Sequence, residues 1–131
     1  MGRVAVTAVI ESIEDLYRVR RGELADDQVR RVTVSDALID TGATALSLPG
    51  RLVRELGLLP ISTRRAVATY GAVKLSVAGR DCVCDVTEVA DECPVLIGQV
   101  PLELMDFVVD PTRRQLLGNP AHGGEQLIEL L

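Results

Sequence analysis

Residues 35–47, which read SDALIDTGATALS, contain the feature that decides the fold. An apolar run at 37–39 is typical of a buried strand, and it leads directly into the carboxylate of Asp40. The next residues are those of a tight turn, Thr41, Gly42 and Ala43. Because a carboxylate contributes little to an apolar core, its position at the end of such a strand calls for a chemical explanation.

Hydrolysis of a peptide bond would explain a carboxylate at this position. A peptide carbonyl is a poor electrophile and neutral water is a poor nucleophile, but two carboxyl groups placed against one water can activate both. The ionised group accepts a proton from the water as a general base, while the protonated group polarises the carbonyl. Two carboxyls this close share one proton. Glycine after Asp-Thr would give the loop room for close approach, and a threonine hydroxyl could lock it.

The segment ALIDTGAT, residues 37–44, resembles the active-site motif of the retropepsin-like aspartic proteases, the retroviral-type (clan AA) family. The segment VLIG, residues 95–98, resembles the second signature of that family, an apolar pair and a glycine that pack beneath the catalytic loop. The likeness extends from about residue 32 to residue 111. It implies a mostly β, closed barrel-like fold for a single domain over residues 1–131, with one or two short helices.

The resemblance also implies site residues. Asp40 would be the catalytic carboxylate, Thr41 would brace the loop against its twin, and Gly42 would allow close approach. The expected active-site loop is Thr41, Gly42 and Ala43, and the expected supporting loop is Leu96, Ile97 and Gly98. The implied chemistry needs neither a metal nor an organic cofactor.

One chain supplies one Asp-Thr-Gly, so the catalytic pair requires two chains. We therefore expect a homodimer with an isologous interface, acting on a peptide or protein substrate. Several other aspartates follow or interrupt apolar segments, but they lack the Thr-Gly that follows Asp40: Asp36, Asp81, Asp85, Asp91, Asp106 and Asp110. A catalytically weak or inactive module of the same fold, used for dimerisation or peptide binding, stays open as an alternative. A small β domain with a chance Asp-Thr-Gly is a third.

Two departures from the family pattern bear on these alternatives. Retroviral relatives often carry arginine after the second-signature glycine, where this chain has Gln99, so the contact made there must differ. The region expected to form a flap, residues 64–77, has a single glycine, Gly71, next to Tyr70. Tyr70 either lies over the cleft or caps a hairpin. A short flap would weaken substrate capture.

Apolar periodicity and turn-forming residues predict further strands and helices. Residues 73–77 alternate as a strand does, and residues 82–89 return after a turn at 78–81. Residues 50–57 carry the signals of a helix that ends at Gly57, and residues 100–106 could form a helical turn. The apolar tail, 125–131, is either a terminal core element or, as we favour, a strand that pairs with a partner subunit beside the N-terminal strand.

Composition argues against several other classes of protein, among them nucleic-acid-binding, membrane-spanning and disulfide-rich proteins. The chain has 131 residues, three aromatics and a net charge of −5 without a basic block, which disfavours nucleic acid and anionic membrane as partners. No apolar run is long enough for a membrane span, and the N-terminus is not a convincing signal peptide. Three cysteines do not suit a disulfide framework, so a cytoplasmic setting is expected. With one histidine and no CxxC spacing, the cysteines are interpreted as core residues and His122 as a surface residue.

Overall fold

The computed structural model of the protein describes residues 4–110, 112–123 and 127–129. Strands dominate it, as the sequence predicts. The strands are β1 Val4–Ser12, β2 Arg31–Ile39, β3 Leu46–Pro49, β4 Leu59–Arg64, β5 Val67–Val77, β6 Arg80–Val89, β7 Leu96–Ile97, β8 Phe107–Asp110, β9 Gln115–Gly118 and β10 Leu127–Glu129. The α-helices are α1 Ile13–Arg20, α2 Gly50–Glu55 and α3 Gln99–Leu104, and 3₁₀ turns occupy Asp26–Gln28 and Pro120–His122.

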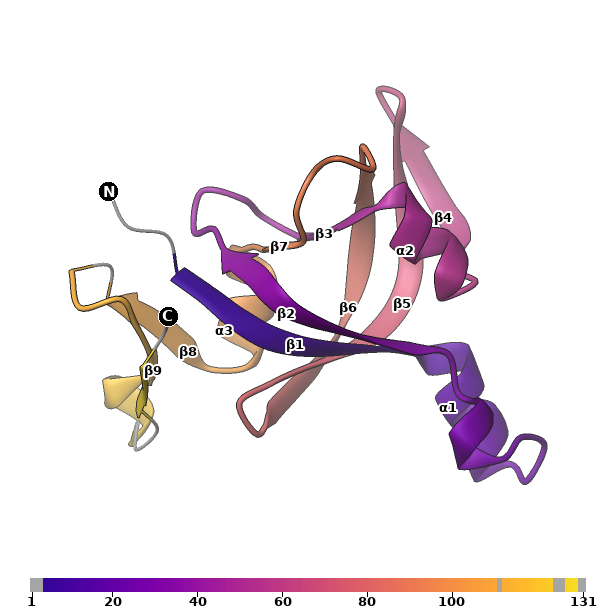
Figure 1. The fold of residues 1–131 in the computed structure, drawn as a ribbon, viewed down its shortest axis with the longest axis horizontal. Coiled ribbons are helices and arrows are strands. Elements are labelled where there is room, and N and C mark those ends of the chain that lie inside the picture. The colour runs from indigo at the N-terminus through magenta and orange to yellow at the C-terminus, as the bar shows by residue number, and fades with distance from the viewer. Residues whose placement is uncertain (1–3, 111, 124–126, 130–131) are drawn as a thin grey trace.

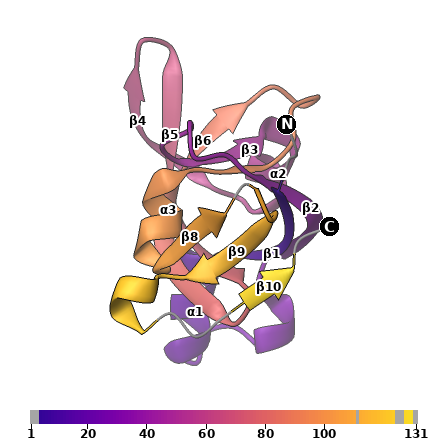
Figure 2. The same cartoon turned by 90° about the vertical axis from the view of Figure 1, so that its left-hand side faces the viewer.

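The main sheet closes on itself. Its strand order is β1-β2-β7-β3-β6-β5-β4, and an additional pairing of β1 with β5 completes a ring that leaves β4 outside, attached to β5 (Figure 1). A second sheet, β10-β9-β8, follows α3 along the chain and lies beside it (Figure 2). The expectation of a mostly β, barrel-like fold with short helices is confirmed.

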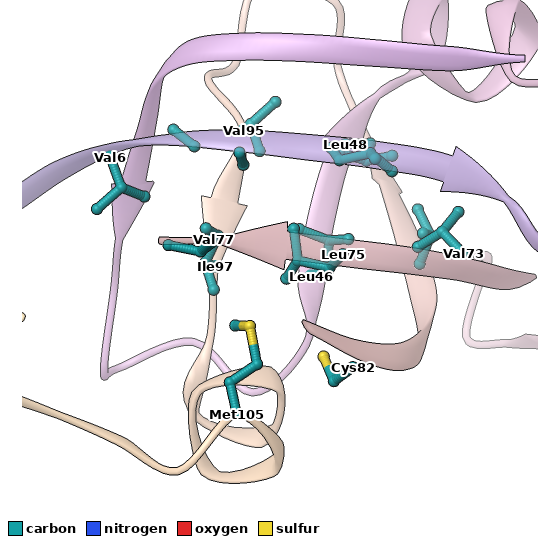
Figure 3. Close-up of a cluster of buried hydrophobic side chains, with 14 of the residues drawn as sticks. Val6, Leu46, Leu48, Val73, Leu75, Val77, Cys82, Val95, Ile97 and Met105 are labelled. Carbon is teal, nitrogen blue, oxygen red and sulfur yellow. The ribbon is translucent and has the colours of Figure 1, made fainter. Parts of the chain in front are cut away.

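Aliphatic side chains fill the interior, as the scarcity of aromatics requires. The alternation predicted for residues 73–77 is observed, because Val73, Leu75 and Val77 are all buried. They pack against buried side chains from other parts of the chain, labelled in Figure 3 as Val6, Leu46, Leu48, Cys82, Val95, Ile97 and Met105. None of the helices in the described ranges is long and apolar enough to cross a membrane.

Helix α1 was not expected from the sequence. The side chain of Ser12 accepts a hydrogen bond from the Asp15 N–H (3.2 Å), which caps the helix N-terminus. The buried carboxylate of Asp15 then accepts three bonds from Arg30: from its backbone N–H (2.9 Å), its Nε (2.8 Å) and its Nη2 (2.9 Å). The helix is therefore stabilised by a polar contact distant in sequence, which an apolar periodicity does not reveal. By contrast, α2 ends as predicted, with Gly57 at φ +64°.

The described part of the tail forms the edge strand of the smaller sheet. β10 pairs with β9 of the same chain, with Leu127 opposite Leu117, so it completes an intrachain sheet. β1 is likewise incorporated in the barrel, between β2 and β5. The remaining tail residues, 125, 126, 130 and 131, lie outside the described residues. Pairing of the terminal strands with a partner subunit stays a prediction, because β10 is an edge strand of its sheet.

Candidate functional site

Asp40 stands where a parallel strand ladder ends. The Leu38 N–H donates to the Val95 carbonyl oxygen (2.9 Å), and the Asp40 N–H donates to the Ile97 carbonyl oxygen (3.0 Å). These bonds extend the parallel pairing of β2 with β7 up to the carboxylate-bearing residue itself. Asp40 is half-buried. The sheet therefore fixes the backbone of Asp40 while its side chain remains partly accessible.

The turn after Asp40 wraps around its carboxylate. The Ala43 N–H donates to the Asp40 carbonyl oxygen (3.0 Å), which closes the turn. The Gly42 N–H donates to Asp40 Oδ1 (2.9 Å), a charge-assisted bond that orients the carboxylate. A Cβ at Gly42 would stand only 3.2 Å from that oxygen, so glycine suits this approach. Thr41 and Gly42 are exposed at the tip of the turn.

Gly98 lies directly beneath the loop. Its N–H donates to the Ala45 carbonyl oxygen (3.0 Å), and the next N–H groups, of Gln99 and Val100, donate to the carbonyl oxygens of Ala43 (2.8 Å) and Thr44 (2.9 Å). A Cβ on Gly98 would lie 2.5 Å from the Ala45 oxygen and 2.7 Å from the Ala43 oxygen, both backbone atoms. The structure thus brings together the two sequence segments, 40–43 and 96–98, that were predicted to form one site.

Gln99 follows directly after Gly98 and begins α3. Its side-chain Nε2 donates to Glu103 Oε1 (2.9 Å), one turn further along α3. The side chain is thus engaged within its own helix, while its backbone N–H holds the loop.

The hairpin expected as a flap exists, but its turn is elsewhere. β4 and β5 are joined at Arg65 and Ala66, which both have positive φ (50° and 65°). Tyr70 lies inside β5, opposite Pro60 and Val86, so the interpretation of Tyr70 as a hairpin cap is wrong.

Tyr70 instead ties the base of the hairpin to β6. Its hydroxyl donates to Glu88 Oε1 (2.8 Å), and this bond raises the pKa of Tyr70. Gly71 is adjacent to it for a packing reason. A Cβ there would be 1.9 Å from Cδ1 of Ile61, so glycine makes room for the Ile61 side chain from β4. Neither residue is at the hairpin tip.

The remaining candidates are structural. Cys82 is buried in the core, and Cys84 is packed against it. Within the described ranges no three His, Cys, Asp or Glu side chains are grouped so as to hold a metal. His122 is exposed, as expected, and its Nδ1 lies 2.7 Å from Asp106 Oδ1, a contact that lowers the pKa of Asp106. Nothing in the sequence pattern pointed to this pair.

Comparison with known proteins finds similarity among solved structures. A scan against models of protein families finds no match, and a search of curated proteins finds none either. Among solved structures, the chain is similar to the EIAV protease complexed with the inhibitor HBY-793. The similarity has a TM-score of 0.45 and 16% sequence identity, and it covers 78% of this chain and 86% of that chain. What this chain does must therefore be argued from its own geometry.

Proposed function

We propose that residues 1–131 form a retropepsin-like aspartic endopeptidase domain that is active as a homodimer. The observation that carries this proposal is the support of Asp40: a half-exposed carboxylate on a turn that is bonded to β7 and seated on Gly98. Groups that must meet a substrate and a second carboxylate with sub-ångström precision need such a rigid support. A chance Asp-Thr-Gly on an ordinary turn would not require it.

In the proposed reaction, a water lies between the Asp40 carboxyls of the two subunits. The ionised carboxylate removes a proton from the water as its oxygen attacks the scissile carbonyl carbon, and the protonated carboxyl donates to the carbonyl oxygen. The tetrahedral gem-diol then collapses: one of its hydroxyls returns a proton to the carboxyl that was left ionised, the carbon–nitrogen bond breaks, and the leaving amine takes a proton from the other carboxyl. Each turnover therefore returns the pair to one shared proton.

Two observations support the proposed dimer, the number of Asp-Thr-Gly motifs and the exposure of the loop. The chain contains a single Asp-Thr-Gly. Thr41 and Gly42 form an exposed, small-residue tip beside Asp40, which leaves space for the same tip of a second subunit. In that arrangement Thr41 would contact its copy and lock the pair of loops.

Peptide-library cleavage by the native protein and by Asp40→Asn tests the proposal. We expect the substitution to reduce cleavage about a thousandfold or more, because it removes a carboxyl that acts in the transition state. Asp36→Asn is the matched control, since Asp36 lies exposed on the same strand, outside the motif, and should leave the rate unchanged. Equal cleavage by native protein and Asp40→Asn, or a protein that sediments as a monomer while cleaving, would contradict the proposal.

A non-catalytic peptide-binding dimer is the second candidate. It is favoured by one observation, the hairpin tip at Arg65 and Ala66, which is not built of glycines that could close tightly over a substrate. Specific peptide binding by the native protein, with no cleavage in the library, would select this candidate.

A further inference from the structure

The tip of the β4–β5 hairpin is a two-stranded ribbon that extends beyond the barrel. β5 is paired with β6 only from Thr69 onward, so residues 67 and 68 have β4 as their strand partner. All of β4, and all residues from 63 to 67, are exposed. Figures 1 and 2 both show this ribbon in the upper half of the molecule, together with the segment between β2 and β3 that contains the Asp40 loop.

The ribbon ends in positive charge on a negatively charged protein. Arg64 and Arg65 are adjacent and exposed at the turn, whereas the whole chain carries a net charge of −5. Within the described ranges neither guanidinium is within 4 Å of a carboxylate, unlike Arg54, which is 3.4 Å from Asp91, or Arg31, which is 3.0 Å from Glu11. The tip therefore presents two cationic groups that are free to bind an anion.

The residues at the turn are not those that stabilise it best. Two-residue hairpin turns with positive φ at both positions favour Asn-Gly, because a Cβ is disfavoured there. Here Arg65 and Ala66 adopt φ 50° and 65°. An arginine at the first of these positions gains nothing for the turn, which is consistent with a role for its side chain in binding.

Resting on the function proposed above, we propose that Arg64 and Arg65 select acidic peptide substrates. In the dimer, each hairpin would place two guanidinium groups beside the chain that lies across the Asp40 pair. Guanidinium groups bind carboxylates through paired N–H···O bonds, so Asp or Glu side chains flanking the scissile bond are the matching chemistry. The Tyr70–Glu88 bond holds the base of the ribbon, from which the tip extends.

Binding can be measured apart from hydrolysis by using Asp40→Asn as the background. Three fluorescent peptides would share an apolar central pair and differ in having acidic, neutral or basic flanks. We expect the acidic peptide to bind roughly threefold to tenfold more tightly than the neutral one, the effect of one or two exposed ion pairs. Raising the salt from 0.05 M to 0.5 M should abolish most of that preference.

The double variant Arg64→Gln/Arg65→Gln should lose the preference and bind all three peptides alike. Its matched control is Arg113→Gln/Arg114→Gln, which removes the same charge from an adjacent arginine pair at the β8–β9 turn, where Arg114 also has positive φ (53°). The control should keep the preference. Equal binding of the three peptides by the parent, or equal loss in both double variants, would overturn this inference. Failure of hydrolysis alone would overturn the proposed function and leave the binding result standing.

Discussion

The Asp40 loop and the β4–β5 hairpin lie in the same half of the molecule but are supported very differently. Five backbone hydrogen bonds join residues 38–45 to residues 95–100: Asp40 to Ile97, Gly98 to Ala45, Gln99 to Ala43, Val100 to Thr44 and Leu38 to Val95. The hairpin tip has only the pairing between its own two strands, and its residues are exposed. One region is fixed by many neighbours, and the other is fixed chiefly at its base.

This difference matches the two tasks that the proposed hydrolytic site would have. Groups that react must be held in one geometry, whereas a segment that captures a polymer must move to admit it. Strand β2 makes the contrast clearer, because it is fixed at both ends. It begins directly after Arg30, which binds the buried Asp15, and it ends directly before Asp40. The hairpin has no second anchor of this kind in the described residues.

Gly98→Ala should disrupt the rigid support of the Asp40 loop. The new Cβ would lie 2.5 Å from the Ala45 oxygen, so backbone must move, and we expect a loss of about 3 kcal/mol in unfolding free energy together with loss of cleavage. Gly79→Ala is the control. Gly79 has open space around its Cβ position but φ +80°, so only conformational strain of about 1 kcal/mol is expected. Urea denaturation measures both, and equal losses would refute the close seating of the loop.

Asp15→Asn tests the contact with Arg30 that holds the N-terminal end of β2. We expect unfolding free energy at pH 7 to fall by about 2 kcal/mol, because charged hydrogen bonds from Arg30 are weakened. The Arg30 side chain lowers the pKa of Asp15 below its ordinary value of 3.8. The native pair therefore stabilises the fold above pH 3.8, and this advantage disappears as pH falls through the lowered pKa. Asp27→Asn, at an exposed position, should change the free energy of unfolding by less than about 0.5 kcal/mol both above and below pH 3.8. A pH-independent difference between native protein and Asp15→Asn would contradict this assignment.

Tyr70→Phe tests the side-chain hydrogen bond at the hairpin base. Removing the hydroxyl bond to Glu88 should cost about 0.5–1 kcal/mol and speed hydrogen exchange of the β4 and β5 amides about two- to fivefold, while exchange at residues 38–43 stays unchanged. Tyr17→Phe is the control, since Tyr17 is 56% exposed on α1. Faster exchange in the Asp40 loop would mean that the two regions are coupled rather than independent.

Much of the fold and of the candidate site was predictable from the sequence. The features that were missed have a common physical reason. Local signals located the strands at 73–77 and 82–89, the turn between them and the end of α2 at Gly57, because each depends on near neighbours in the chain. The association of residues 96–98 with Asp40 came from paired motifs. The features that were missed depend on partners far away in sequence: the Asp15–Arg30 pair that stabilises α1, the Tyr70–Glu88 bond, and the Ile61 side chain that accounts for Gly71. Periodicity carries no information on such pairs.

Ala66→Gly tests the backbone strain at the hairpin turn and should give the smallest change in the free energy of unfolding. Ala66 has φ +65°, a conformation that costs an L-residue about 1 kcal/mol and costs glycine almost nothing. Glycine also adds entropy to the unfolded chain, so the net gain should be about 0.5 kcal/mol, or about 2 °C in Tm. Ala72→Gly, further along β5 and without a positive φ, should instead lose about 0.5–1 kcal/mol. Thermal unfolding that shifts in the same direction for both variants would show that the tip is not strained. Opposite signs would show that the chain keeps a strained residue at the tip, in contrast to the glycines that relieve crowding beneath Asp40.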